Sequence, residues 1–321
     1  MTPIAVVSNP RSEHNKRGMA NIEACLAGRP GVIHVRFEPG MDLVEVTADL
    51  AARGTRLLVT NSGDGLVHGL LGALFQGGAF PTTPPLALLP RGMANMTAAD
   101  VGLGSRGADT LARVLDAARR GDIERHLVRR RVLKIEYDPA KPAERGMFFG
   151  AAGIYDAVQL TTGRMHGAGL KGAWANAATL LTVLGRAVTR GVASLGLGGE
   201  AVGIGLDGDP VDTRPRALVL ATTLDRLVLG SRPFWNPGAG PVHFTAFDHP
   251  AAGLVRHARR ILYGGKRRRL PDPPYRSRDA SRVELRLERP FTIDGEFFQV
   301  PPGSPVVVTA EEEVRFVKLR A

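Results

Sequence analysis

Short apolar runs alternate with amphipathic stretches over the first 125 residues of the chain. The runs have the length and the β-branched content of buried strands, and each ends at a turn that opens a helix-like stretch. Strand–turn–helix units of this length predict a mostly parallel sheet covered by helices on both faces. Strands are expected at 4–8, 32–37, 56–60 and 86–89, and helices at 18–26, 42–53, 66–75, 94–100 and 108–119.

After about residue 125 the pattern changes to short strand signals separated by turn residues. A long helix or two shorter ones over 168–190 and a Pro/Arg-rich loop over 264–281 interrupt these signals. The pattern predicts a second, β-rich domain, with two last strands at 305–309 and 314–319 that fit either domain. The other strands are expected at 126–137, 146–152, 202–206, 217–223, 241–247 and 283–287.

Composition adds the class of protein to this picture. Hydrophobic residues make up 44% and charged residues 23% of the 321 residues, which is typical of a globular protein. The single cysteine, Cys25, excludes an internal disulfide and a cysteine-based zinc cluster, and a reducing compartment is expected. The longest mostly apolar stretch, 172–184, is too short to cross a membrane, and the first residues do not resemble a signal peptide. We therefore expect a cytoplasmic protein.

The chain is strongly basic. Lys and Arg number 42 against 31 Asp and Glu, which gives a formal charge of +11. Such an excess favours an anionic partner such as a nucleotide, an acidic membrane surface or a nucleic acid. A GC-rich genome that favours arginine codons explains it equally well, so charge alone does not choose.

Three turns follow predicted strands and precede predicted helices, where ligands bind in parallel sheets. They are Asn9-Pro10-Arg11-Ser12, Ser62-Gly63-Asp64-Gly65-Leu66 and Pro90-Arg91-Gly92-Met93-Ala94-Asn95. Glycines allow close backbone approach, and free N–H groups at a helix start attract phosphate. The Asp in the second turn suggests a metal ion, a hydroxyl proton or a ribose, although a helix cap also explains it.

Three further turns lie in the predicted second domain. Gly153-Ile154-Tyr155-Asp156-Ala157 precedes a helical stretch, and Ile293-Asp294-Gly295-Glu296 brings two carboxylates into one turn. A hairpin explains the latter equally well. For Asp207-Gly208-Asp209 a hairpin is the preferred interpretation.

Taken in order, these motifs resemble the diacylglycerol kinase-like lipid kinase family, which includes diacylglycerol, sphingosine and ceramide kinases and their bacterial relatives. The resemblance extends over roughly residues 4–319. It implies an α/β nucleotide-binding domain of the NAD kinase/diacylglycerol kinase type over 1–125, to which the chain end at about 300–321 returns. A C-terminal β-sandwich domain over 126–299 is expected to bind lipid.

The resemblance also implies roles for individual residues. ATP and Mg²⁺ are expected as cofactors, with Glu296 and Asp64 as metal ligands. Asp294 is the first candidate for the general base that accepts the proton of the lipid hydroxyl, and Asp64 is the second. Asp156 and His68 are expected near the lipid substrate. The expected nucleotide-binding residues are Asn9, Pro10, Arg11, Lys16, Arg17, Ser62, Gly63, Asp64, Gly65, Gly92, Met93, Asn95 and Glu296.

The substrate is less sharply defined than the family. The form Ser-Gly-Asp-Gly-Leu-x-His, which ends at His68, is similar to sphingosine kinases and favours a sphingoid base or ceramide, with diacylglycerol close behind. Gly69 stands where that form continues with Glu, Met93 replaces a family Thr, and a Pro-x-x-x-x-Asp-Gly stretch of bacterial members is absent at 233–238. These departures leave open a catalytically inactive lipid-binding relative. A soluble-substrate kinase of the NAD kinase type is the remaining alternative.

A lipid kinase must meet its substrate at a membrane. We expect peripheral contact with the anionic inner face of the membrane, and no nucleic acid partner; the oligomeric state is open. Solvated loop charge explains the same basic side chains equally well. They are Arg125, Arg129, Arg130, Arg131, Lys266, Arg267, Arg268 and Arg269.

Overall fold

The computed structural model describes residues 3–158 and 199–319, and these form two compact units. The first unit comprises Met1–Arg130 and Glu313–Ala321, and the second comprises Arg131–Glu312. The helix expected at 168–190, including the apolar stretch 172–184, lies outside the described residues. None of the helices in the two described ranges is long and apolar enough to cross a membrane.

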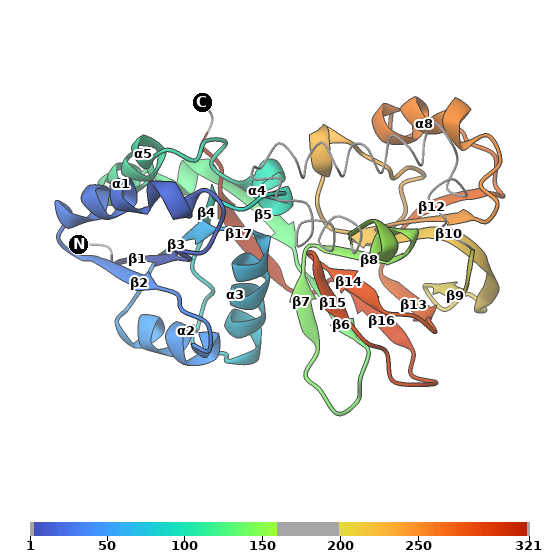
Figure 1. Ribbon diagram of the computed structural model, residues 1–321, viewed down its shortest axis with the longest axis horizontal. Coiled ribbons are helices and arrows are strands. Elements are labelled where there is room, and N and C mark those ends of the chain that lie inside the picture. Colours follow the sequence, from blue (N-terminus) through green and yellow to red (C-terminus); the bar gives the residue numbers. More distant parts are fainter. Residues whose placement is uncertain (1–2, 159–198, 320–321) are drawn as a thin grey trace. The chain divides into compact units, whose positions relative to one another are not determined.

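The first unit is built on a six-stranded sheet in the order β2-β1-β3-β4-β17-β5. Its pairings β1–β2, β1–β3, β3–β4 and β4–β17 are all parallel. Figure 1 shows α1 and α5 on one face of the sheet and α2 and α3 on the other. The elements are β1 (Ile4–Ser8), α1 (Asn15–Ala27), β2 (Val32–Arg36), α2 (Leu43–Ala52), β3 (Leu57–Ser62), α3 (Asp64–Gln76), β4 (Leu86–Pro90), α4 (Met96–Val101), α5 (Ala108–Arg120), η1 (Ile123–His126), β5 (Leu127–Arg131) and β17 (Glu313–Val317).

The apolar pattern explains these elements. Strands β1 and β3 are buried along their whole length, as expected for a parallel sheet covered on both sides. The Asp42 side chain accepts the N–H of Val44 at 2.7 Å and so fixes the start of α2. Helix α1 begins three residues before the predicted position, because Asn15 is buried in its first turn.

The second unit contains an eleven-stranded sheet, whose strand pairings among the described residues are antiparallel. The main path runs β15-β14-β8-β10-β9-β13-β16-β6-β7; off this path, β11 pairs with β10, and β12 pairs with β11. The strands are β6 (Leu133–Glu136), β7 (Glu144–Gly146), β8 (Phe148–Ala152), β9 (Glu200–Leu206), β10 (Asp212–Thr222), β11 (Val242–Asp248), β12 (Tyr275–Ala280), β13 (Arg282–Arg286), β14 (Phe291–Ile293), β15 (Glu296–Phe298) and β16 (Val306–Thr309).

This sheet curls around one apolar core. Tyr137, which follows β6, meets Phe291 of β14 and Phe298 of β15 at ring-centroid distances of 5.3 and 5.7 Å. These residues come from nearly opposite ends of the strand order, so the sheet must fold back on itself. Of the two last strands, β16 lies in the second unit and β17 in the first. The predicted fold class, α/β followed by an antiparallel β-rich part, is confirmed.

Two predictions for the second unit were wrong in part. The stretch 264–281, expected to be a loop throughout, contains the strand β12, which pairs with β11. Sequence reasoning also missed the helix α8 (Leu254–Tyr263). This helix buries Leu254 and Ile261 in a second apolar cluster with Trp235, Phe247 and Tyr275.

Candidate functional site

Three βα turns lie side by side at one edge of the first unit's sheet. Strands β1, β3 and β4 are parallel neighbours, so their carboxyl ends share this edge. Backbone hydrogen bonds join the turns directly, since Asn9 N–H donates to the Asn61 carbonyl at 3.1 Å and Arg91 N–H to that of Ser62 at 2.9 Å. The structure therefore brings together the three turns that the sequence singled out in this unit.

The second and third turns touch through their glycines. A Cβ atom on Gly63 would lie 2.8 Å from the Cα of Gly92, a distance that real Cβ contacts do not show. Such close packing of two backbones is possible only because neither glycine carries a side chain. This is the arrangement expected of a surface that binds phosphate through the backbone.

Asp64 connects the second turn to helix α4. Its carboxylate accepts the N–H groups of Met96 at 3.1 Å and Thr97 at 3.3 Å, and so caps the first turn of that helix. Asn95 precedes α4 in the left-handed conformation, at φ 49°, and its side chain exchanges two 2.7 Å hydrogen bonds with the backbone of Gly92. Asp64 and Asn95 thus both shape the Gly92 turn.

A buried polar network lies behind the turns. The side-chain amide of Asn15 donates to the carbonyls of Asn9 and Asn61, 2.8 Å in each case. The amide of Asn61 in turn donates to the Ser8 hydroxyl at 2.9 Å, and its oxygen accepts the Nε–H of Arg91 at 3.2 Å. Side chains from both neighbouring strands and from α1 therefore hold the three turns in one arrangement.

Arg91 is the unusual member of this network. It is only 6% exposed, and no carboxylate among the described residues pairs with it. Burial, followed by the nearby charge of Arg106, lowers the pKa of the Arg91 guanidinium from its ordinary value. A buried cation without a counter-ion is costly, and an anionic ligand would remove that cost.

Further cationic groups surround Arg91. Arg106 lies within hydrogen-bond distance of Nε2 of His14, and Nδ1 of the same ring lies 3.3 Å from the Arg91 carbonyl oxygen. Arg11, Lys16 and Arg17 are exposed on the turn after Asn9 and on the start of α1, and Lys16 pairs with Glu13 at 2.9 Å. This edge of the unit is therefore positively charged.

The first turn shapes itself through Asn9. The Asn9 side chain accepts the N–H of Arg11 at 2.9 Å, an Asx turn that leads the chain away from β1 after Pro10. The roles expected of Asn9 and Pro10 at the nucleotide therefore fall on a turn that their own side chains preorganise.

Leu66 and His68, which match the sphingosine kinase form, and Gly69, which departs from it, are packed inside the unit. Leu66 is 5% and His68 8% exposed on α3, so neither is a surface residue. Gly69 faces Leu43 of α2, and a Cβ there would lie 2.6 Å from the Leu43 Cδ1 atom. A glycine rather than a glutamate at this position allows α2 and α3 to pack closely.

Asp294, in the second unit, forms the turn between β14 and β15 together with Gly295. Both have positive φ, 49° and 96°, and the pairing of Ile293 with Glu296 makes this a two-residue hairpin. The carboxylate accepts the N–H groups of Met147 and Phe148 at 2.9–3.2 Å and is 8% exposed. Glu296, by contrast, is exposed. The Asp294 carboxylate thus has a structural task beside any catalytic one.

Asp156 belongs to a second group of charged residues. Arg289 binds its carboxylate with two guanidinium nitrogens, at 2.5 and 3.1 Å, and lies 3.7 Å from Glu200. Both Glu200 oxygens are buried without a hydrogen-bond partner. Burial raises the pKa of Glu200 above its ordinary value, against the opposing effect of Arg289. One guanidinium is therefore shared by two carboxylates.

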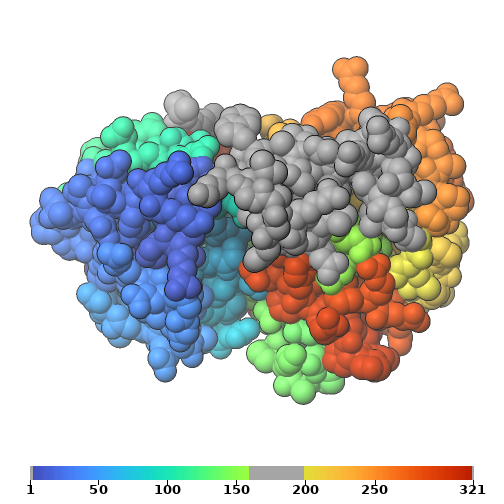
Figure 2. Space-filling model, viewed as in Figure 1, coloured from blue at the N-terminus to red at the C-terminus, as the bar shows by residue number. Residues whose placement is uncertain are grey.

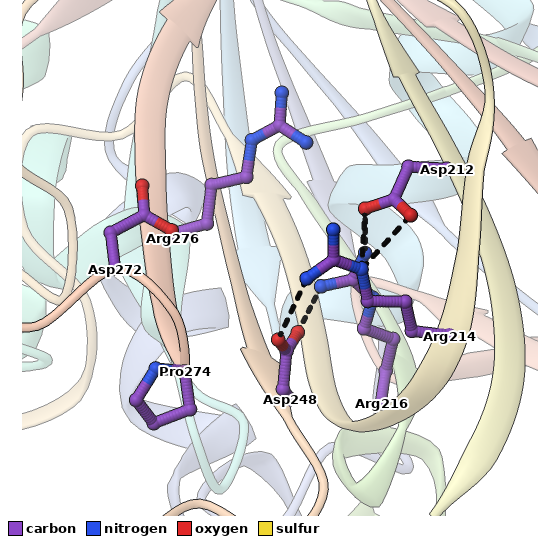
Figure 3. Close-up of a pocket in the computed structure, with 7 residues that line it drawn as sticks. All are labelled: Asp212, Arg214, Arg216, Asp248, Asp272, Pro274 and Arg276. Atoms are coloured by element: carbon purple, nitrogen blue, oxygen red, sulfur yellow. Dashed lines mark hydrogen bonds and ion pairs between the residues drawn. The ribbon is translucent and has the colours of Figure 1, made fainter.

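A polar pocket of about 240 Å³ opens between β10, the end of β11 and the start of β12 (Figure 3). Arg216, which is 2% exposed, lies between Asp212 and Asp248, and the exposed Arg214 binds the same two carboxylates. Burial disfavours the Asp212 carboxylate, but its ion pairs outweigh this and lower its pKa. Positive and negative charges balance, so we interpret the pocket as an ion-pair network that joins the strands. Its lining residues are Asp212, Arg214, Arg216, Asp248, Asp272, Pro274 and Arg276.

A metal ion fits the first unit only with help from its ligand. No group of three or more His, Cys, Asp or Glu residues in the described parts of the chain could hold a metal by itself. Mg²⁺ commonly needs only one or two carboxylates beside phosphate oxygens and water. The two Asp64 oxygens accept the backbone N–H groups of Met96 and Thr97, and a carboxylate oxygen can accept more than one hydrogen bond. Asp64 thus suits a metal that arrives with a nucleotide.

Comparisons with known proteins agree with this picture. Residues 3–126 match the model of the diacylglycerol kinase catalytic domain. Two solved structures of a proposed diacylglycerol kinase from Bacillus anthracis strain Sterne share 15% identity with this chain, with TM-scores of 0.66 and 0.67. They cover 98% of this chain and 96–97% of their own, and at this identity they establish the shared fold. No curated protein matches the sequence.

The fold and the matched domain define a kinase, a phosphotransferase with an alcohol group as acceptor, which confirms the predicted class of enzyme. The match over residues 3–126 is to the catalytic domain of the diacylglycerol kinases, and it confirms the predicted resemblance to that group of lipid kinases.

Four residues of these sites escaped sequence reasoning. Arg91 was visible inside a motif, but nothing in the sequence shows that it is buried without a carboxylate. Arg106, Glu200 and Arg289 lie in turns or at strand ends without a motif, and only the folded chain brings them to His14 and Asp156.

Proposed function

We propose that this protein is an ATP-dependent lipid kinase that transfers the γ-phosphate of ATP to the primary hydroxyl of a membrane lipid. The observation that carries the proposal is the buried Arg91 guanidinium, which has no carboxylate partner among the described residues and lies beside the three turns at the carboxyl ends of β1, β3 and β4. A triphosphate supplies the anion that this site lacks.

The nucleotide-binding role falls to the first unit. Backbone N–H groups of the turns after Asn9, Ser62 and Gly92 would hold the phosphates, and Arg91 would neutralise them from below. The exposed cations would act from the solvent side; they are Arg11, Lys16, Arg17 and Arg106. This distribution resembles what phosphoryl transfer requires, because positioning and charge neutralisation supply most of the catalysis.

Mg²⁺ would bind the phosphates together with Asp64, and Glu296 is the second proposed ligand. The ion would neutralise charge that develops on the transferred phosphoryl group. Asp294 and Asp64 are the two candidates for the base, because a primary alcohol must lose its proton to a carboxylate within hydrogen-bond reach. Backbone N–H groups donate to both carboxylates and so hold them in fixed orientations.

For the acceptor we propose a neutral lipid headgroup. The Ser62–His68 stretch favours a sphingoid-type substrate, while Arg289 already neutralises Asp156 with two contacts. A neutralised carboxylate attracts an ammonium group less than a free one does, so ceramide is favoured over the free sphingoid base. Diacylglycerol, which is also neutral, is the second candidate.

An ADP-release assay tests the proposal. The purified full-length chain with Mg-ATP is offered mixed micelles of ceramide, diacylglycerol or sphingosine, with NAD as a soluble acceptor in a separate arm. We expect ADP release that depends on lipid, with ceramide or diacylglycerol ahead of sphingosine. Release with NAD alone would show a soluble-substrate kinase, and lipid binding without any ADP would show an inactive relative.

Two variants assign the base. Asp64→Asn and Asp294→Asn each keep an oxygen that can accept a backbone N–H, so both should remain folded. The variant that lacks the base should lose at least a hundredfold in kcat while its KM for ATP stays near that of the parent. If both retain near-normal kcat, neither carboxylate is the base.

A further inference from the structure

Helix α8 and the loop after it form the most one-sidedly charged segment that the structure describes. Residues 254–270 contain seven Lys or Arg and not one Asp or Glu. A surface helix normally carries charges of both signs. An excess of one sign confined to a single segment indicates an anionic partner rather than general solubility.

One of the seven cations has a structural role. Arg268 is 7% exposed, donates to four backbone carbonyls, including those of Arg232 and Ile261, and lies 5.0 Å above the Trp235 ring. Burial lowers the pKa of Arg268 to about 10. Arg268 therefore fastens the loop to α8, and the solvent-facing charge belongs to Arg256, Arg259, Arg260, Lys266, Arg267 and Arg269.

These six side chains have no ion-pair partner among the described residues, unlike the other basic cluster of the sequence. Arg125 pairs with Asp122, Arg129 with Glu313 and Arg130 with Asp100, and Arg131 donates to the Glu311 carbonyl. Internal partners already use that cluster, so the two groups that the sequence treats alike differ in the folded chain. Of these two clusters, the one on α8 and its loop is therefore the one left for an external anion.

The exposed face of α8 also carries apolar side chains among its arginines. Val255, Arg259 and Tyr263 follow each other at four-residue intervals and therefore line one side of the helix. Val255 is 51% and Tyr263 55% exposed, while Leu254, Ala258 and Ile261 are buried on the opposite side. In Figure 1 α8 lies outside the strands β10 and β12, and in Figure 2 side chains of the orange segment around it project from the surface.

We propose that the exposed face of α8, defined by Val255, Arg256, Arg259, Arg260 and Tyr263, docks onto an anionic lipid bilayer. Arginine side chains at the level of the headgroups bind lipid phosphates. Tyrosine prefers the boundary between the headgroups and the acyl chains. Lys266, Arg267 and Arg269 add attraction at longer range. A nucleic acid would use the cations but has no comparable place for Val255, so the apolar residues favour a membrane.

This inference rests on the proposed lipid kinase function in one respect: that function explains why the protein would dock, because docking would bring the enzyme to its substrate. Binding is measured without ATP, by co-sedimentation of the full-length chain with phosphatidylglycerol/phosphatidylcholine vesicles or with pure phosphatidylcholine vesicles. Phosphorylation of a short-chain, water-soluble ceramide or diacylglycerol tests the kinase function separately. Vesicle binding without activity would contradict only the proposed kinase function. Activity without vesicle binding would contradict only the docking proposal.

Three variants locate the surface. Arg256→Gln/Arg259→Gln/Arg260→Gln should weaken binding to the anionic vesicles about 100-fold, since each surface cation contributes about fivefold. Val255→Ser/Tyr263→Ser should weaken it about tenfold and should do so even at high salt, where screening leaves mainly the apolar contribution. The matched control Arg125→Gln/Arg129→Gln/Arg131→Gln removes the same charge and should retain binding within threefold.

The outcome is decided by comparison among these proteins. All substituted side chains on α8 are exposed, so circular dichroism should show the parent fold for each variant. Equal losses in the α8 and control triples, or unchanged binding of both α8 variants, would overturn the docking proposal. Stronger binding of a short DNA duplex than of anionic vesicles, lost in the α8 triple, would assign the face to nucleic acid instead.

Discussion

Gly92 lies so close to Gly63 that a Cβ atom on Gly92 would stand 2.4 Å from the Gly63 Cα. The contact joins the ends of β3 and β4 without a side chain between them. It fixes the spacing of the two turns whose N–H groups we assign to phosphate, and it shows why both positions hold glycine.

Gly92→Ala should therefore destabilise the protein and weaken its site. An added methyl group must push one backbone away from the other, and forced overpacking costs about 1–3 kcal/mol. Denaturant titration measures the loss in the free energy of unfolding. Gly28→Ala is the control, because nothing lies within 4 Å of its new Cβ. Equal stability of both variants would show that the turns separate freely.

The buried arginine of the polar pocket allows a second test. Arg216→Met removes the cation between Asp212 and Asp248 and should cost about 3 kcal/mol, because partly buried carboxylates lose their partner. Arg214→Met removes an exposed partner of the same two carboxylates and should cost much less, because water screens an exposed ion pair. Thermal or urea unfolding of the pair compares them. A larger loss for Arg214→Met would contradict the network described here.

Glu200 predicts a pH dependence of stability. Its folded-state pKa is raised, chiefly by burial, so the folded protein favours the protonated carboxyl more than the unfolded chain does. The stabilisation is complete below the ordinary value of 4.5 and is lost as pH rises through the raised value.

Glu200→Gln cannot ionise, so its unfolding free energy should gain on that of the parent as pH rises above about 4.5. Urea unfolding between pH 4 and 8 gives both curves. Glu288→Gln removes an exposed neighbouring carboxylate and should not reproduce the gain. Parallel curves for the parent and Glu200→Gln would refute the burial argument.

The regular elements of the first unit could be predicted because buried parallel strands have nearly continuous apolar sequences, as β1 and β4 do. Strand β12 was missed because Arg276, Arg278 and nearby prolines suggested a loop, whereas its pairing with β11 and the contacts of Arg278 with Asp207 and Asp209 hold it in the sheet. Helix α8 did carry a signal: Leu254, Ala258 and Ile261 have helical spacing.

The candidate site was predictable only as far as its turns. The glycines, Asp64 and Asn95 shape turns or cap a helix, and they lie within short stretches of the chain, so they appear as short motifs in the sequence. The Arg91 guanidinium depends on burial by other segments, and Arg289 reaches Asp156 from 133 residues away. Such relationships are set by tertiary packing and have no sequence period.

The most direct test of the central claim is nucleotide binding by Arg91 variants. Isothermal titration of Mg-ATP into the full-length chain, without lipid, should show about 10- to 100-fold weaker binding for Arg91→Met, because a charge-assisted contact contributes about 1.5–3 kcal/mol. Arg36→Met, which removes an exposed arginine paired with Glu23 in the same unit, should bind like the parent. Unchanged ATP affinity in a folded Arg91→Met protein would contradict the assignment of this site to the triphosphate.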